Sequence, residues 1–226
     1  MTLGGSDILR GISFRTEEGL IMLIGSNGSG KTTLLKTLAG LIESFRGSLR
    51  INERDIRSMK RKEIARLIGF VWQNPYYGFI EPRVYDEIIL ITRILNEKNY
   101  DKEIIERLVD PQLFNRDPFT LSGGEAKRVS IASILIMDQP IWLLDEPFDY
   151  LDMKGVIDLI DLIREKRRRK IIIISSVNTG YIRLIEPDKI MLLERGELKY
   201  FGDAEHIEDE ILESSGVMSR RMICGE

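Results

Sequence analysis

The sequence has little cysteine and no long apolar run. Cys224 is the single cysteine among 226 residues, so an internal disulfide is excluded, as is usual in a reducing compartment. The start lacks the basic and apolar segments of a signal peptide. The longest apolar stretches, 131–137 and 171–174, fall short of the roughly 18 residues that a membrane-spanning helix needs. If the protein serves a membrane, we expect it to act there through partners.

A strong charge of either sign is also absent. The 33 basic and 36 acidic residues give a net charge of -3, which favours neither nucleic acid nor an anionic membrane as a partner. Hydrophobic residues make up 43% of the sequence and charged residues 31%, as in soluble globular proteins. The length of 226 residues fits one domain, with room for an inserted lobe.

Short apolar runs alternate with stretches of helical periodicity. The runs at 19–25, 141–144 and 170–174 predict buried strands, and the spacing at 32–41 predicts a helix. Two apolar runs on either side of Gly196 predict a β-hairpin. The pattern predicts an α/β core with an antiparallel β component.

The character of the chain changes between Asn74 and Thr120. Proline and aromatic residues open this segment, and helical periodicity follows at 84–95 and 101–109. We interpret the segment as a helical lobe inserted into the core. The chain is then a single domain, 1–226, with three parts: an α/β core of residues 1–73 and 125–205, a helical subdomain of residues 74–124 and a C-terminal tail of residues 206–226.

A complete GxxxxGK[ST] motif lies between the first of these strands and the helix that follows it. Its glycines let the backbone amides converge on phosphate oxygens. We expect Lys31 to reach the β- and γ-phosphates of a nucleotide and the Thr32 hydroxyl to hold Mg²⁺. The predicted phosphate-binding residues are Gly25, Ser26, Asn27, Gly28, Ser29, Gly30, Lys31, Thr32 and Thr33.

Two adjacent acids end the strand at 141–144. Asp145 suits the coordination shell of Mg²⁺, and Glu146 suits the orientation and deprotonation of an attacking water. An Asp-Glu pair alone is weak evidence, because solvated strand ends often carry one. Downstream of a phosphate-binding loop, the pair indicates a site of nucleotide hydrolysis.

The five residues Leu121–Glu125 allow two interpretations. Ser122, Gly123 and Gly124 could present a hydroxyl and bare amides at the start of a helix, which would make a second anion site. The alternative is an ordinary capping box, in which Ser122 and Glu125 cap the helix. The occurrence of three motifs in this order favours the first interpretation.

Together the motifs resemble those of the ATP-binding-cassette (ABC) ATPases, from about Ile8 to Phe201. The loop at 25–32 is similar to the Walker A loop of that family, 121–125 to its signature and 141–146 to its Walker B strand. The resemblance extends to two further positions, where Gln73 matches the Q-loop glutamine and Leu151–Asp152 the D-loop.

The resemblance implies a RecA-like P-loop NTPase fold, with an antiparallel β-subdomain and an inserted helical subdomain. It implies ATP hydrolysis with ATP and Mg²⁺ as cofactors, Gln73 joining Thr32 and Asp145 at the metal. It also implies a head-to-tail dimer with a second ABC ATPase subunit, in which each ATP lies between one phosphate loop and the other subunit's signature. The residues offered to the partner's ATP would be Leu121, Ser122, Gly123, Gly124, Glu125 and Asp152.

The family docks its integral membrane subunits on the helical lobe, which implies a peripheral position on the cytoplasmic face of the membrane. The segments 73–75, 84–87 and 211–217 resemble the ATPases of energy-coupling-factor transporters, which import vitamins and transition-metal ions. An alternative is a soluble ABC ATPase acting on nucleic acid or ribosomes, although such proteins often carry long insertions or two cassettes. A P-loop kinase or GTPase would leave 121–125 unexplained.

The sequence departs from the family at its switch histidine. The segment after the strand at 170–174 contains no histidine, and His206 lies too far along the chain. We expect Ser176 at the switch position, with Asn178 as the alternative. Neither becomes an imidazolium, so hydrolysis at this chain's own phosphate loop is expected to be slow, unless a polar side chain or water substitutes. A heterodimer is therefore favoured over a homodimer.

Aromatic residues raise two further questions. Residues 1–13 contain none, whereas the family stacks adenine on an aromatic there, and Phe14 is expected to point into the core. Adenine would then be held weakly or by another side chain. The cluster of Tyr76, Tyr77 and Phe79 after Gln73 could be lobe core or part of a groove for a partner's helix.

Overall fold

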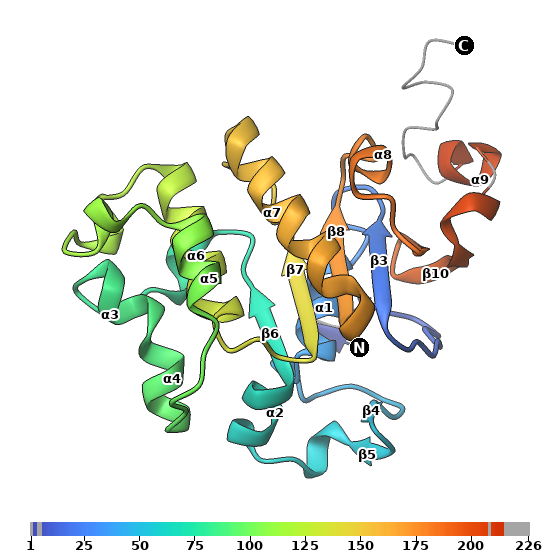
Figure 1. The fold of residues 1–226 in the computed structure, drawn as a ribbon. Helices are drawn as coiled ribbons and strands as arrows, with labels where there is room; N and C mark the ends of the chain where they lie inside the picture. The colour runs from blue at the N-terminus through green and yellow to red at the C-terminus, as the bar shows by residue number, and fades with distance from the viewer. Residues whose placement is uncertain (1, 4–5, 208, 215–226) are drawn as a thin grey trace.

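A six-stranded sheet forms the centre of the protein (Figure 1). The computed structural model describes residues 2–3, 6–207 and 209–214. The strand order is β10-β9-β3-β8-β7-β6. The strands, in chain order, are β3 (Gly19–Ile24), β6 (Ile68–Val71), β7 (Ile141–Asp145), β8 (Ile171–Ser176), β9 (Lys189–Glu194) and β10 (Glu197–Asp203).

The sheet is parallel except at one edge. β3 pairs in parallel with β8 and β9, β8 with β7, and β7 with β6, whereas β10 runs antiparallel to β9. Parallel strands are covered on both faces, which explains why their sequences are continuous apolar runs. The carboxyl ends of β3, β7 and β8 lie at one edge of the sheet, where ligand sites of such folds are found.

Alternate residues of β3 belong to two different cores. Leu20, Met22 and Ile24 pack with α6 (Gly123–Leu135) and α7 (Met153–Lys166), whereas Ile21 and Leu23 pack with α1 (Lys31–Leu38) and α2 (Arg61–Leu67). In Figure 1, α7 crosses in front of the sheet and α1 lies behind it. The expected α/β fold is therefore confirmed.

A group of helices lies to one side of the sheet, on the left in Figure 1. Its members are α3 (Val84–Ile88), α4 (Leu90–Leu95), α5 (Lys102–Leu108) and α6. The helical periodicity predicted over 84–95 is present as two helices that meet at Ile89, where φ is -88° and ψ is 1°. The Ile89 carbonyl accepts from the Thr92 hydroxyl at 2.7 Å and from Arg93 N at 3.2 Å. The division of the chain at residues 74, 125 and 206 stays a prediction.

The remaining elements are short. The strand pairs β1–β2 and β4–β5 are antiparallel ladders of two residues each. Their bounds and those of the last helices are β1 (Thr2–Leu3), β2 (Ser6–Asp7), β4 (Arg50–Ile51), β5 (Arg54–Asp55), α8 (Tyr181–Ile185) and α9 (Asp209–Ser214). The segment 211–217, which resembles the energy-coupling-factor ATPases, lies partly outside the described residues. No helix in the described part of the chain combines the length and hydropathy needed to cross a membrane.

Candidate active site

The phosphate loop joins β3 to α1 and has a backbone that only glycine suits at two positions. Gly25 has a φ of 156°, and a Cβ there would lie 2.2 Å from the carbonyl oxygen of Leu193. Gly30 has a φ of 105° and directly precedes α1. The loop tip at 26–28 is exposed, whereas Ser29 is buried and Thr33 half-buried on α1. The strand, loop and helix therefore stand in the order that phosphate binding requires.

Lys31 is buried over this loop. Its Nζ donates to the carbonyl oxygens of Gly25 at 2.8 Å and Ser26 at 3.3 Å, and lies 3.8 Å from Glu146 Oε1. Burial lowers the pKa of Lys31, and the carboxylates of Glu146 and Asp145 oppose this shift. The positive charge of Lys31 thus adds to that of the loop's backbone amides and of the N-terminal end of α1, which favour an anion at the same place.

Asp145 ends β7 and meets residues from two other elements. Its Oδ1 accepts hydrogen bonds from the Thr32 hydroxyl at 3.1 Å and from the Ser175 hydroxyl at 2.7 Å. Asp145 is only 1% exposed, so both hydrogen bonds are made in the interior of the protein. A hydroxyl and a carboxylate that converge in this way are oxygen donors of the kind Mg²⁺ takes alongside nucleotide phosphates.

Glu146 follows in a left-handed backbone conformation, with a φ of 43°. Its backbone N–H donates to the Ser175 hydroxyl at 2.9 Å, and its Oε2 accepts from Val177 N at 3.3 Å. Burial raises the pKa of Glu146, although the nearby Lys31 lowers it. A buried carboxylate with a raised pKa, beside a phosphate loop, is suited to act as a general base.

The predicted switch residues form a small turn after β8. The Ser176 hydroxyl is 2% exposed, donates to the Asn178 carbonyl at 3.2 Å and accepts from Asn178 N at 3.0 Å. Asn178 uses its own Oδ1 to accept from Gly180 N at 2.9 Å. Both side chains are thus engaged within residues 176–180.

Gln73 lies just after β6 and is exposed. Its Nε2 lies 3.4 Å from Asp149 Oδ2, and within the described residues no hydrogen bond joins it to Thr32 or Asp145. The structure therefore places Gln73 beside the loop that follows Glu146 rather than on the predicted metal donors.

The signature lies apart from the phosphate loop, at the start of α6. The Ser122 hydroxyl and backbone N–H both donate to Glu125 Oε2 at 2.8 Å, so the capping box is present. A Cβ on Gly124 would lie 3.1 Å from the Tyr150 carbonyl oxygen. Asp152 caps α7 and accepts from Arg128 of α6 at 2.6 Å. The signature and the predicted D-loop therefore form one neighbourhood, in which Ser122 and Asp152 are exposed.

Two residues with direct contacts to the site were not predicted. Ser175 touches both Asp145 and Glu146, and Lys127 of α6 donates to the carbonyls of Trp72 and Gln73. The sequence offered one signal for each. Ser175 is a hydroxyl residue at the end of a predicted strand, and Lys127 is a lysine in a helix that is otherwise rich in small and apolar residues.

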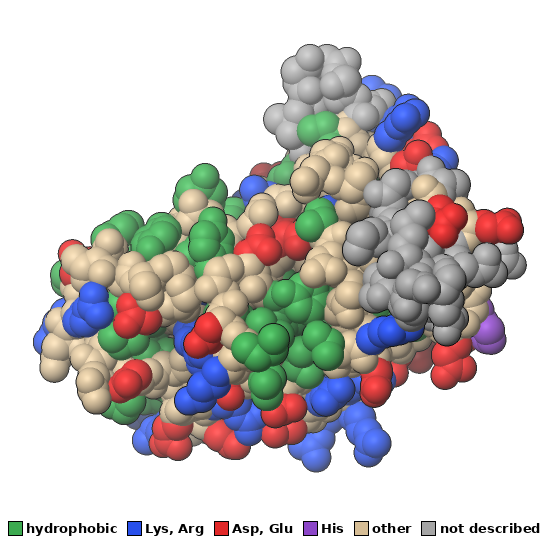
Figure 2. Space-filling view, turned by 90° about the horizontal axis from the view of Figure 1, so that it is seen from above, with side chains coloured by type: hydrophobic (Ala, Val, Ile, Leu, Met, Phe, Trp, Pro, Cys, Tyr) green, Lys and Arg blue, Asp and Glu red, His purple; other side chains and the backbone are tan. Residues whose placement is uncertain are grey.

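The aromatic residues divide between core and surface. Phe79 is buried, whereas Tyr77 is 73% exposed and Ile80 beside it 77%. Phe14 is half-buried and packs against the core, with the centre of its ring 5.4 Å from that of Phe201. Figure 2 shows hydrophobic side chains exposed over the helical part of the protein, on its left.

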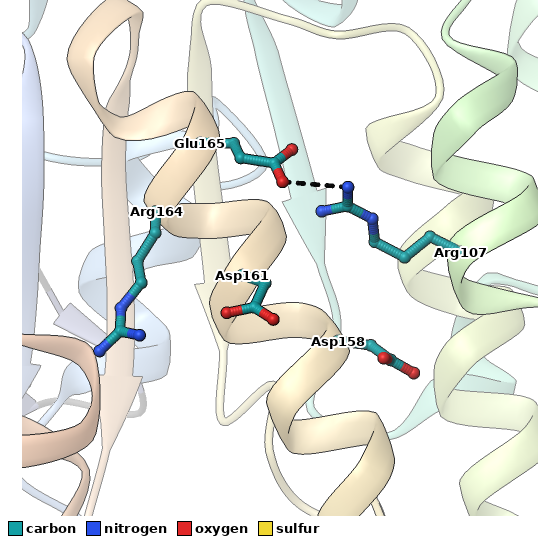
Figure 3. A pocket seen from close by; sticks show the side chains of 5 residues that line it. All are labelled: Arg107, Asp158, Asp161, Arg164 and Glu165. Carbon is teal, nitrogen blue, oxygen red and sulfur yellow. Dashed lines mark hydrogen bonds and ion pairs between the residues drawn. The ribbon is translucent and has the colours of Figure 1, made fainter.

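A cleft of about 430 Å³ lies elsewhere, between α5 and α7. Figure 3 shows Arg107 of α5 reaching toward Glu165 of α7, with Asp158 and Asp161 on the same helix. Arg107 pairs with Glu165 at 3.0 Å and with Glu103 at 3.2 Å. The pair of Arg107 with Glu165 therefore bridges the cleft, and none of its lining residues belongs to the phosphate loop or the signature.

Comparison with known proteins places this geometry in a family. The model of the ABC transporter family matches residues 9–149. A protein of Pyrococcus horikoshii named as an ABC transporter ATP-binding protein is 37% identical over 224 residues, which span 97% of this chain and 86% of that protein. The energy-coupling factor transporter ATP-binding protein EcfA1 of Fusobacterium nucleatum is 35% identical over 204 residues, spanning 87% of this chain and 76% of that protein.

The fold is also shared with solved structures. An ATP-binding cassette solved as a dimer in a post-hydrolysis state, with ADP and Pi, superposes with a TM-score of 0.78 and 22% identity over 90% of this chain and 94% of that chain. At that identity the likeness concerns the fold. The family model and the sequence relatives establish the family as well as the fold. The chain belongs to the ABC transporter family, in which it is an ATP-binding ATPase.

Proposed function

We propose that this chain is the ATP-hydrolysing subunit of a membrane importer of the energy-coupling-factor type, and that it works in a head-to-tail nucleotide-sandwich dimer. One observation carries the proposal. Lys31, Thr32, Asp145 and Glu146 gather at one place, whereas the exposed Ser122 begins a helix elsewhere. The two groups of residues lie apart within this chain, which supports completion of each nucleotide site by a second subunit.

The residues fit Mg–ATP by their chemistry. Lys31 would bind the β- and γ-phosphates, and Thr32, Asp145 and Gln73 would hold Mg²⁺, which neutralises charge on the phosphates. Glu146 would orient and deprotonate the attacking water. Ser176 stands where the family has its switch histidine.

We propose that the second subunit is a different ABC ATPase. The Ser176 hydroxyl is engaged with Asn178 and cannot carry a positive charge toward a γ-phosphate. The signature, in contrast, has at Ser122, Gly123 and Gly124 the same residue types that the family has in its signature. This chain would then complete its partner's site while turning over its own ATP slowly.

Two observations support the proposed importer type and membrane partner: the resemblance to named relatives and a group of exposed apolar side chains. Relatives named EcfA1 and EcfA2 are 34% to 38% identical. The exposed Tyr77, Ile80 and Phe119 lie on the segment where the family docks its membrane subunits. Docking there would hold the chain on the cytoplasmic face of the membrane.

Affinity purification of the tagged chain from membranes of its source organism tests this proposal. We expect two co-purifying proteins, an integral membrane subunit and a second chain with Walker and signature motifs, both identified by mass spectrometry. The double variant Tyr77→Ser, Ile80→Ser should lose the membrane subunit and keep the ATPase partner. Leu184→Ser, which changes another half-exposed apolar residue, is the control. Recovery of ribosomes or nucleic acid instead would support the soluble alternative and contradict the proposal.

A further inference from the structure

A fully buried lysine joins the signature helix to the segment that carries Gln73. Lys127 lies on α6, two residues after Glu125, and none of its surface is exposed. Its Nζ donates to the carbonyl oxygens of Trp72 and Gln73, both at 2.9 Å. Lysine is almost never fully buried without partners, so these two hydrogen bonds account for where its side chain lies.

The two carbonyls lie beyond the end of the sheet ladder. The pairing of β6 with β7 ends at Val71, opposite Leu144. Residues 72 and 73 therefore depend on other elements for their hydrogen bonds. Lys127 supplies donors to two consecutive carbonyls, which holds both the position and the orientation of this backbone.

The Trp72 side chain is in contact with the helix that starts at the phosphate loop. Lys36 Nζ of α1 lies 5.1 Å from the centre of the Trp72 ring. The rings of Phe70 and Tyr77 meet it edge-on, at 4.9 Å and 6.4 Å. Trp72 thus lies between α1, which begins at the phosphate loop, and α6, which begins at the signature.

The charge of Lys127 is balanced from a distance rather than by an ion pair. Within the described residues no carboxylate lies close enough to Nζ for a salt bridge, while Asp149, Asp145 and Glu146 are the acidic groups that act on it. The carbonyl dipoles of Trp72 and Gln73 are its direct partners. This arrangement depends on the relative position of α6 and residues 72–73, because the donor and the acceptors belong to different elements.

We propose that Lys127 is a positioning residue that couples nucleotide binding at this chain's phosphate loop to the position of its own signature, by tying α6 to the backbone of Trp72 and Gln73. The inference rests on the proposed function, in which Gln73 takes part in binding Mg–ATP. A shift of Gln73 toward bound nucleotide pulls on the two carbonyls, and Lys127 transmits that shift to the start of α6. Coupling of this kind runs through contiguous packed elements, here β6, residues 72–73 and α6.

Hydrogen–deuterium exchange on the full chain, with and without Mg–ATP, tests the coupling. In the wild type we expect ATP to slow exchange at the phosphate loop, at 72–78 and at 122–130. In Lys127→Met, which keeps the length of the side chain but no donor, the slowing at 122–130 should be lost. ATP affinity should stay within about threefold of the wild type while turnover falls about fivefold, since binding residues are untouched. Lys127→Arg, which restores N–H donors and charge, should recover part of the effect.

Lys170→Met is the matched control. Lys170 is also buried, and its Nζ donates to the consecutive carbonyls of Asp138 and Gln139, both at 2.6 Å, just before β8 begins. Its loss should lower stability without changing the response to ATP at 122–130. If Lys127→Met fails to fold, Lys127→Leu, which also lacks a donor, takes its place.

The results separate this inference from the proposed function. Absence of Mg–ATP binding to the wild type would contradict the proposed function itself. Binding without slower exchange at 122–130 in the wild type would overturn the coupling alone. An unchanged ATP response at 122–130 in Lys127→Met, or its equal loss in Lys170→Met, would overturn it as well.

Discussion

The Ser175 hydroxyl donates to Asp145 Oδ1 at 2.7 Å and at the same time accepts the backbone N–H of Glu146 at 2.9 Å. It lies on β8, directly opposite Asp145 in the strand register. One buried hydroxyl therefore orients the proposed metal ligand and supports the left-handed backbone of the proposed general base. Glu146 has a φ of 43°, a conformation that costs free energy in a residue with a side chain.

We expect Ser175→Ala to lower both turnover and stability. It leaves the buried N–H of Glu146 without an acceptor, which typically costs about 1–3 kcal/mol of unfolding free energy. Turnover should fall about tenfold with little change in ATP affinity, because Lys31 is untouched. ATPase assays and urea denaturation measure the two effects.

Ser133→Ala is the control for this variant. Ser133 is also buried, and its hydroxyl donates to the Ser130 carbonyl at 3.0 Å within α6. The loss of that hydrogen bond should cost about 1 kcal/mol and leave turnover unchanged. Equal turnover in Ser175→Ala and Ser133→Ala would contradict the positioning role of Ser175.

Two glycines of the phosphate loop should respond differently to an added methyl group. A Cβ on Gly25 would lie 2.2 Å from the Leu193 carbonyl oxygen, whereas one on Gly28 meets nothing within 4 Å. Gly28→Ala should lower the free energy of unfolding by only about 1–2 kcal/mol, which is the cost of a left-handed backbone in a residue with a side chain. Gly25→Ala forces β9 and the loop apart, so it should destabilise the protein by more and abolish ATP binding.

Thermal unfolding and titration of Mg–ATP into both variants check this prediction. Equal stability of Gly25→Ala and Gly28→Ala would contradict the packing of the loop against Leu193.

Lys127 should make the stability of the protein depend on pH in the alkaline range. Burial lowers its pKa from 10.5 to about 8, against the opposing effects of Asp149, Asp145 and Glu146. Between these two values the unfolded chain binds more protons than the folded chain, so this lysine's contribution to stability rises with pH. Lys127→Met should remove that contribution.

Denaturation in urea at pH 7.5, 8.5 and 9.5 measures the effect, at values chosen around the folded pKa of about 8. The stability of the wild type relative to Lys127→Met should increase along this series. A constant difference would show that Lys127 titrates alike in the folded and unfolded chain.

The sequence predicts much of this architecture because its signals are local. The glycine spacing that ends in Lys31 and Thr32, and the acids that end an apolar strand, identify two stretches of chain, and the structure brings Thr32 and Asp145 within 3.1 Å. The strand–loop–helix order follows from periodicity alone.

Ser175 and Lys127 were missed for a different reason. A serine at a strand end is ordinary until the register of β7 and β8 places it opposite Asp145. A lysine in a helix is normally exposed, and only the packing of α6 against the end of β6 buries Lys127. Both roles arise from contacts between elements distant in sequence, which composition and spacing do not encode.

ATP turnover by the purified chain alone tests the central claim most directly. We predict Mg–ATP binding that Lys31→Ala abolishes, together with turnover below about 1 per second, the low end for enzymes. The proposed reasons are that Ser176 stands in place of the switch histidine and that no partner signature is present. Addition of the partner ATPase should raise the rate. Fast turnover by the chain alone, abolished by Glu146→Gln, would contradict the division of labour between this chain and a different second subunit.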